Sequence, residues 1–167
     1  MNIGVVGLGK MGLQIAKKLS QAGFTVIGYD PSISAELAHP IALTLSLAAL
    51  AQQAEIIWLM VPAGSIVDTC INEMLPHMQP DSIVVDGGNS FYKDSIKRAQ
   101  FLATKEMHFL DCGTSGGTHG LEHGFSLMVG GKLDIYNRVE PLLKTLAAPN
   151  GYGLMGEAGA GHFVKMV

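Results

Sequence analysis

The chain has few of the residues that would suit it to nucleic acid, a membrane surface or a metal. Charged residues make up 15% of its 167 positions and the formal net charge is −3, with no block of basic residues. This balance argues against nucleic-acid and anionic-membrane partners. Only two cysteines are present, Cys70 and Cys112, and they lack metal-ligand spacing. Reduced thiols in a cytoplasmic protein are therefore expected.

Long apolar runs are also missing. The longest, Ile56–Val61, is far too short to cross a bilayer, and an apolar strand begins at residue 2, where a signal peptide would stand. His119 and His123 lie four positions apart without a third ligand at useful spacing, so no metal site is expected. What the chain does have is 48% hydrophobic residues, over a length that suits one well-buried domain but not two.

The N-terminus carries the most informative motif. An apolar strand over residues 2–6 runs into Gly7-Leu8-Gly9-Lys10-Met11-Gly12, and an amphipathic helix follows. This G-x-G-x-x-G order predicts a tight turn at Gly7, phosphates close to the backbone at Gly9 and close helix–strand packing at Gly12. The helix amides would then face a pyrophosphate. The alternative is an ordinary βαβ unit whose glycines serve only the turn.

A second strand over residues 25–29 ends in Asp30, the expected partner of the adenine ribose hydroxyls. A 2′-phosphate at that position would meet a like charge, so NAD is expected to be preferred, with NADP as the alternative. The following residues are Pro31 and Ser32, and no arginine occurs before Arg98 to hold such a phosphate.

Short apolar runs alternate with helical stretches along the rest of the chain. Near-continuous Val/Ile/Leu strands in this order indicate an α/β, Rossmann-like, doubly wound and mainly parallel sheet with helices on both faces. Later strands are expected at residues 56–61, 82–86, 108–112, 126–129 and 152–154, and later helices at 33–38, 45–53, 64–74, 92–104 and 133–146.

Such sheets bind ligands at the carboxyl ends of their strands, which is where polar and glycine-rich segments gather in this sequence. They are Gly7–Gly12, Asp30, Val61-Pro62-Ala63, Asp86–Ser90 and Cys112–Gly117. Turn chemistry alone does not explain five such segments at one edge, so the edge is predicted to be a ligand site.

Two of these segments offer groups for an anionic or polyhydroxylated ligand. Asn89 carries an amide after two glycines, and Thr114-Ser115-Gly116-Gly117 supplies two hydroxyls and free amides at a predicted helix start. The alternatives are local: Asn89 or Ser90 would cap the next helix, and Thr114 or Ser115 would act as an N-cap.

Lys165 is the only lysine in the terminal stretch 159–167. Among apolar neighbours it can serve as a general base, because desolvation favours the neutral amine; a solvated helix lysine is the alternative. A core or capping role is expected for His162 and a structural one for Cys112.

Together these strings resemble the 6-phosphogluconate dehydrogenase family of the β-hydroxyacid dehydrogenases. The loop Gly7–Gly12 is similar to the superfamily's cofactor loop, and residues 161–167 resemble the start of the family's catalytic helix. The strings Asp86–Ser90 and Gly113–Gly117 separate this family from hydroxyisobutyrate-type enzymes, which usually carry a Ser-Thr pair where Asn89-Ser90 stands.

The resemblance implies oxidative decarboxylation of 6-phosphogluconate to ribulose 5-phosphate. Lys165, with Asn89 beside it, would act catalytically by removing the C3 hydroxyl proton. The sugar acid would be held by Asn89, Ser115, Gly116 and Gly117. The cofactor would be bordered by Gly7, Leu8, Gly9, Lys10, Met11, Gly12, Asp30, Val61, Pro62, Ala63 and Asn89.

Residues 1–167 are expected to be the dinucleotide-binding domain, ending inside the family's catalytic helix. The family's C-terminal helical domain lies outside this sequence, so the stretch is expected to be inactive alone and the full-length form to be a homo-oligomer. The alternatives are another β-hydroxyacid dehydrogenase acting on a small hydroxy acid, or a non-catalytic nucleotide-binding module.

Overall fold

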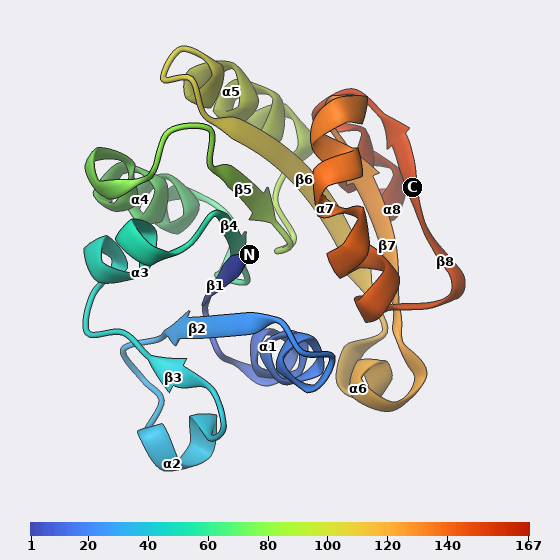
Figure 1. Cartoon of the computed structure of the whole chain (residues 1–167). Coiled ribbons are helices and arrows are strands. Elements are labelled where there is room, and N and C mark those ends of the chain that lie inside the picture. The colour runs from blue at the N-terminus through green and yellow to red at the C-terminus, as the bar shows by residue number, and fades with distance from the viewer.

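The structure, a computed structural model, describes residues 1–167 as an eight-stranded sheet covered by helices (Figure 1). The strands are β1 (Asn2–Val6), β2 (Thr25–Tyr29), β3 (Ala42–Leu43), β4 (Ile56–Leu59), β5 (Ile83–Asp86), β6 (His108–Ser115), β7 (Phe125–Gly130) and β8 (Ala147–Gly156). Their order across the sheet is β3-β2-β1-β4-β5-β6-β7-β8, and only the β6–β7 pair is antiparallel. The predicted doubly wound, mainly parallel sheet is confirmed.

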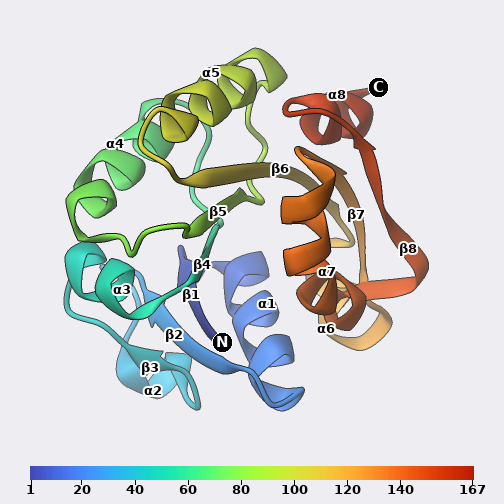
Figure 2. The same ribbon diagram turned by 45° about the horizontal axis from the view of Figure 1, so that its top comes forward.

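Helices cover both faces of this sheet. They are α1 (Lys10–Gln21), α2 (Ala35–Ala38), α3 (Leu47–Gln53), α4 (Ser65–Met74), α5 (Tyr92–Ala103), α6 (Gly120–His123), α7 (Leu133–Leu146) and α8 (Ala160–Met166), with 3-10 turns η1 (Leu75–His77) and η2 (Gly117–His119). Helices α1 and α7 pack on one face and α3 and α4 on the other, while α5 and α8 lie side by side (Figure 2). None of them has both the length and the apolar character that a membrane crossing requires.

Alternation along the strands explains why both faces need cover. In β4, Trp58 is fully buried in the cluster that contains α1 and α7, whereas its neighbours Ile57 and Leu59 belong to the cluster beneath α3 and α4. Because successive side chains point to opposite faces, a strand that is apolar throughout must be buried on both sides. The near-continuous apolar runs of the sequence thus become the central strands.

The turn between β1 and α1 is built as the glycine spacing predicts. Gly7 has φ +89°, a conformation that side chains rarely adopt. A Cβ on Gly12 would overlap the carbonyl oxygen of Gly7, so α1 lies directly against the end of β1. These two glycines bring the first turn of α1 to the carboxyl edge of the sheet.

Two strands, β6 and β8, are longer than predicted. Strand β6 does not stop at Cys112 but continues to Ser115, because β7 pairs antiparallel with it from Asp111 to Ser115. The stretch Cys112–Gly117 is therefore mostly strand, and only its last residues form a loop. Strand β8 likewise begins at Ala147, directly after α7, rather than near Tyr152.

At the opposite edge an exposed polar cluster joins three elements. Asp81, which precedes β5, accepts a hydrogen bond from Nε2 of His108 in β6 and lies 3.2 Å from Nη1 of Arg138 in α7. The hydrogen bond from His108, helped by the charge of Arg138, holds the pKa of Asp81 below its usual value.

A carboxyl whose folded-state pKa is lowered contributes stability above its unfolded pKa, and that stability is lost as the pH falls through the folded value. We therefore expect Asp81→Asn to be less stable than the parent at pH 7, with the difference shrinking once the pH falls below the ordinary carboxyl value of 3.8. Urea unfolding from pH 7 to pH 3 measures this. A difference that does not change across that range would contradict the assignment.

Candidate functional site

The first turn of α1 is open at the carboxyl edge of the sheet. Its N-cap, Gly9, makes no side-chain capping bond, and a Cβ there would meet nothing within 4 Å. The first amides of a helix have no partner within the helix and carry the positive end of its dipole. An uncapped start on a glycine loop is therefore a backbone cradle suited to a phosphate.

Asp30 is held against this loop. One of its carboxylate oxygens accepts a hydrogen bond from the amide of Leu8 at 2.7 Å, and the other accepts from the amide of Ser32 at 2.8 Å. The side chain is half-buried, so it is oriented but still reachable. Each carboxylate oxygen can accept more than one bond, so Asp30 retains acceptors for ligand hydroxyls.

The loops after β4 and β5 lie next to each other at the same edge. Pro62 and Ala63 are exposed after β4, and Asn89 is exposed after β5. A cavity of about 380 Å³ lies between these loops and the end of α8. It is lined by Ala63, Gly64, Asn89, Ser90, Phe91, Asp94 and Met166.

The two candidate catalytic residues are in contact. The ammonium of Lys165 donates a hydrogen bond of 2.8 Å to Oδ1 of Asn89, although the residues are 76 positions apart. Lys165 is half-buried, and its hydrogen bond to Asn89 lies at the exposed edge of the sheet. The capping alternative for Asn89 is wrong, because the N-cap of α5 is Phe91, without a side-chain bond.

The segment Thr114–Gly117 spans the end of β6 and the turn that follows it, and its residues differ in exposure. Thr114 is buried and its hydroxyl donates to the carbonyl of Cys112 at 3.3 Å, because this residue lies within β6 rather than in a loop. Ser115, Gly116 and Gly117 are exposed at the edge. The helix expected there is only the 3-10 turn η2 followed by the short α6.

Two other residues have the structural roles that the sequence favoured. Burial raises the pKa of the Cys112 thiol to about 12, so it stays protonated and is a poor nucleophile. His162 is 1% exposed, and its Nδ1 lies 2.8 Å from the hydroxyl of Ser95 in α5.

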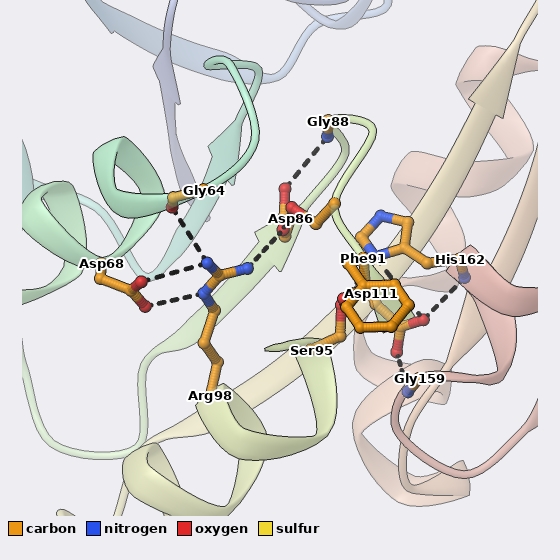
Figure 3. Close-up of polar contacts among 11 residues, drawn as sticks. Gly64, Asp68, Asp86, Gly88, Phe91, Ser95, Arg98, Asp111, Gly159 and His162 are labelled. Carbon is orange, nitrogen blue, oxygen red and sulfur yellow. Dashed lines mark hydrogen bonds and ion pairs between the residues drawn. The ribbon is translucent and has the colours of Figure 1, made fainter. Parts of the chain in front are cut away.

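Sequence reasoning missed Arg98, which joins three segments beneath the site (Figure 3). Its side chain is 5% exposed. Its Nε is 2.8 Å from Oδ1 of Asp68, its Nη2 donates to the carbonyl of Gly64 at 3.1 Å, and its Nη1 lies 3.8 Å from Oδ2 of Asp86. Burial works against the charged form, but the bonds and charges of Asp68 and Asp86 outweigh it and raise the pKa of Arg98.

Asp86 connects Arg98 to the loop that carries Asn89. It is fully buried at the end of β5, where it accepts hydrogen bonds from the amide of Gly88 at 3.1 Å and the hydroxyl of Ser90 at 2.5 Å. The sequence did carry one signal for this network, because Asp86 is an acidic residue at the end of an apolar strand. An acid at such a position is buried and must find hydrogen-bond partners.

Comparison with known proteins gives consistent matches. A family described as the NAD binding domain of 6-phosphogluconate dehydrogenase matches residues 2–156. An NAD(+)-dependent, decarboxylating 6-phosphogluconate dehydrogenase from Haloferax volcanii is 42% identical over 174 residues, which cover 100% of this chain. The chain spans 57% of that relative's length.

Solved structures of two related enzymes also superpose on the chain. A 3-hydroxyisobutyrate dehydrogenase from Mycobacterium tuberculosis, solved with L-serine, has a TM-score of 0.90 at 29% identity, over 98% of this chain and 57% of its own. A Plasmodium falciparum 6-phosphogluconate dehydrogenase, described as apo, with its cofactor NADP+ and with its substrate, has a TM-score of 0.89 at 27% identity, over 99% of this chain and 39% of its own.

The chain's two arginines form a matched pair for testing the Arg98 anchor. Arg98→Met leaves the buried Asp86 without its cation and should lower the free energy of unfolding by about 3 kcal/mol. Arg138→Met removes an exposed pairing and should cost less than about 1 kcal/mol. Denaturant unfolding of both variants measures the difference, and equal losses would show that Arg98 is no anchor.

Proposed function

Since the chain belongs to the family of the NAD binding domain of 6-phosphogluconate dehydrogenase, we propose that it serves the NAD-linked oxidative decarboxylation of 6-phosphogluconate to ribulose 5-phosphate. The observation that carries this proposal is the 2.8 Å bond between Lys165 and Asn89. It joins a basic amine to an amide at the edge where the glycine loop also opens.

The residues at the edge suit a dinucleotide. The glycine loop and the uncapped start of α1 would take the pyrophosphate, and the oriented carboxylate of Asp30 would accept from the adenine ribose hydroxyls. Val61, Pro62, Ala63 and Asn89 would border the other end of the molecule. When bound, the nicotinamide supplies the acceptor for the hydride that leaves the substrate carbon.

Lys165 would act as the base. In its neutral form the amine takes the proton from the hydroxyl of the carbon being oxidised, so that the oxygen can form the carbonyl. Asn89 orients the amine by accepting one of its hydrogens. The product is a β-keto acid, which loses carbon dioxide because the ketone accepts the electrons of the broken C–C bond.

The sugar acid would be held by Asn89, Ser115, Gly116 and Gly117. Amides and hydroxyls suit a carboxylate or hydroxyl group. Ser115, Gly116 and Gly117 are exposed at the end of β6, and Asn89 is exposed after β5, the neighbouring strand.

A second candidate is oxidation of a small hydroxy acid, because the superposed structures include a 3-hydroxyisobutyrate dehydrogenase. The Asn89-Ser90 string favours the sugar acid, as does the 42% identity to the Haloferax volcanii relative. Turnover of the full-length protein with 6-phosphogluconate and with 3-hydroxyisobutyrate separates the two.

The base is tested by Lys165→Met in the full-length protein. We expect kcat to fall by about 10²–10⁴-fold, the usual contribution of a general base, with the dissociation constant for the coenzyme nearly unchanged. Lys144→Met, an exposed lysine of α7, is the matched control and should keep the parent rate. Loss of coenzyme affinity with an unchanged rate at saturation would make Lys165 a binding residue instead.

The coenzyme preference is tested at Asp30. We expect NAD to bind at least about tenfold more tightly than NADP, because the carboxylate repels a 2′-phosphate. The double variant Asp30→Asn, Pro31→Arg should shift the preference towards NADP, whereas Glu36→Gln, an exposed acid in α2, should not. Fluorescence titration with both coenzymes measures this. Tighter NADP binding by the parent, or an unchanged ratio in the double variant, would remove Asp30 as the discriminator.

A further inference from the structure

A buried carboxylate holds the first turn of α8. The N-cap of this helix is Gly159, which has no side chain to cap the free amides. Asp111 in β6 takes the place of a capping side chain. Its Oδ1 accepts from the amide of Gly159 at 2.7 Å and its Oδ2 from the amide of His162 at 2.9 Å (Figure 3). These are the N-cap and N3 amides, the pair that a local capping box satisfies.

The helix also lies directly on the sheet backbone. A Cβ on Gly113 of β6 would lie 2.6 Å from Cβ of Lys165 and 3.0 Å from the carbonyl oxygen of Gly161. A Cβ on Gly130 of β7 would lie 2.8 Å from the amide nitrogen of Gly161. With no side chains between helix and strands, α8 has little freedom to rotate or slide once its first turn is fixed.

A third attachment comes from α5. His162 is buried, and its Nδ1 meets the hydroxyl of Ser95 at 2.8 Å, while the same nitrogen lies 4.0 Å from Oδ2 of Asp111. Ser95 is itself fully buried, so no water competes for this contact. The His162 backbone is thus fixed by β6 and its side chain by α5.

We propose that Asp111 is the positioning residue for Lys165. Gly161 and Lys165 are four residues apart and therefore lie on the same face of α8. When Asp111 fixes the first turn, the Cβ of Lys165 is placed against Gly113 and its ammonium reaches Asn89 beyond the strand end. This proposal rests on the proposed function of Lys165 as the base.

Both oxygens of the Asp111 carboxylate are needed, because each accepts a different amide of the first turn of α8. Asparagine has the same shape but only one acceptor, so its NH₂ group would face one of the two amide donors. Asp111→Asn should therefore release one amide of the first turn while leaving the core volume unchanged.

The test follows the Lys165 amine directly, in the full-length protein. Acetylation by an N-hydroxysuccinimide ester, read by mass spectrometry, gives the labelling rate of Lys165 relative to the exposed Lys144 as an internal reference. In Asp111→Asn we expect this ratio to rise about fivefold, because the amine loses its hydrogen bond to Asn89. Val139→Ala, a core change in α7, controls for lost stability and should leave the ratio unchanged.

Kinetics provide the second readout. A base displaced by about 1 Å loses about 100-fold in rate, so kcat of Asp111→Asn should fall by that factor while the dissociation constant for NAD changes less than about twofold. If Asp111→Asn acted only by lowering stability, its kcat would equal that of a Val139→Ala control with the same free energy of unfolding. An unchanged labelling ratio or a kcat equal to that of the control would overturn the proposal.

The outcomes separate the two proposals. If Lys165→Met keeps the parent rate, the proposed base is wrong, yet the labelling ratio still reports whether Asp111 positions the side chain. If Asp111→Asn does not fold, Ser95→Ala removes the attachment from α5 and should raise the ratio by a smaller factor. A Ser95→Ala ratio equal to the parent's would then overturn the proposal.

Discussion

A buried carboxylate must find hydrogen-bond donors, and this requirement organises the carboxyl half of the sheet. Asp86 and Asp111 are both fully buried, and each accepts hydrogen bonds from a later segment of the chain. Asp86 accepts from the amide of Gly88 and the hydroxyl of Ser90, and Asp111 accepts from the amides of Gly159 and His162. Leaving either acid unpaired would cost far more than a lost surface contact. Each segment is therefore held in one arrangement: the loop that carries Asn89 by Asp86, and the helix that carries Lys165 by Asp111.

The two helices that approach the site use their N-termini in opposite ways. Helix α1 begins at Gly9 with its first amides uncapped and open space around the glycine. Helix α8 also begins after a glycine, but Asp111 accepts the amides of Gly159 and His162, and the carbonyl of Glu157 accepts the amide of Ala160. Glycine at the helix start therefore does not indicate a phosphate site by itself; what matters is whether another part of the chain supplies the acceptor.

The sequence predicted the parts of the fold that depend on local pattern. The strand Ile56–Leu59, predicted as residues 56–61, follows from a continuous apolar run, and the turn at Gly7 follows from the glycine spacing. The extension of β6 to Ser115 could not be read locally, because it depends on pairing with β7. Arg98 was missed for a related reason, since its partners Asp68 and Asp86 come from two other elements and nothing in the helix pattern marks it as buried.

The antiparallel pairing of β6 and β7 has a further consequence for how such a domain changes over evolution. Residues 116–124 form the tip of a hairpin whose two arms are hydrogen-bonded from Asp111 to Ser115. A hairpin tip that stands in solvent can lengthen or shorten without altering the register of its arms, but this tip packs on α1. Lys18 donates to the carbonyls of Gly120 and Leu121, and the amide of Leu121 donates to Gln14. The length of the hairpin is therefore tied to the position of α1, the helix that begins at the glycine loop.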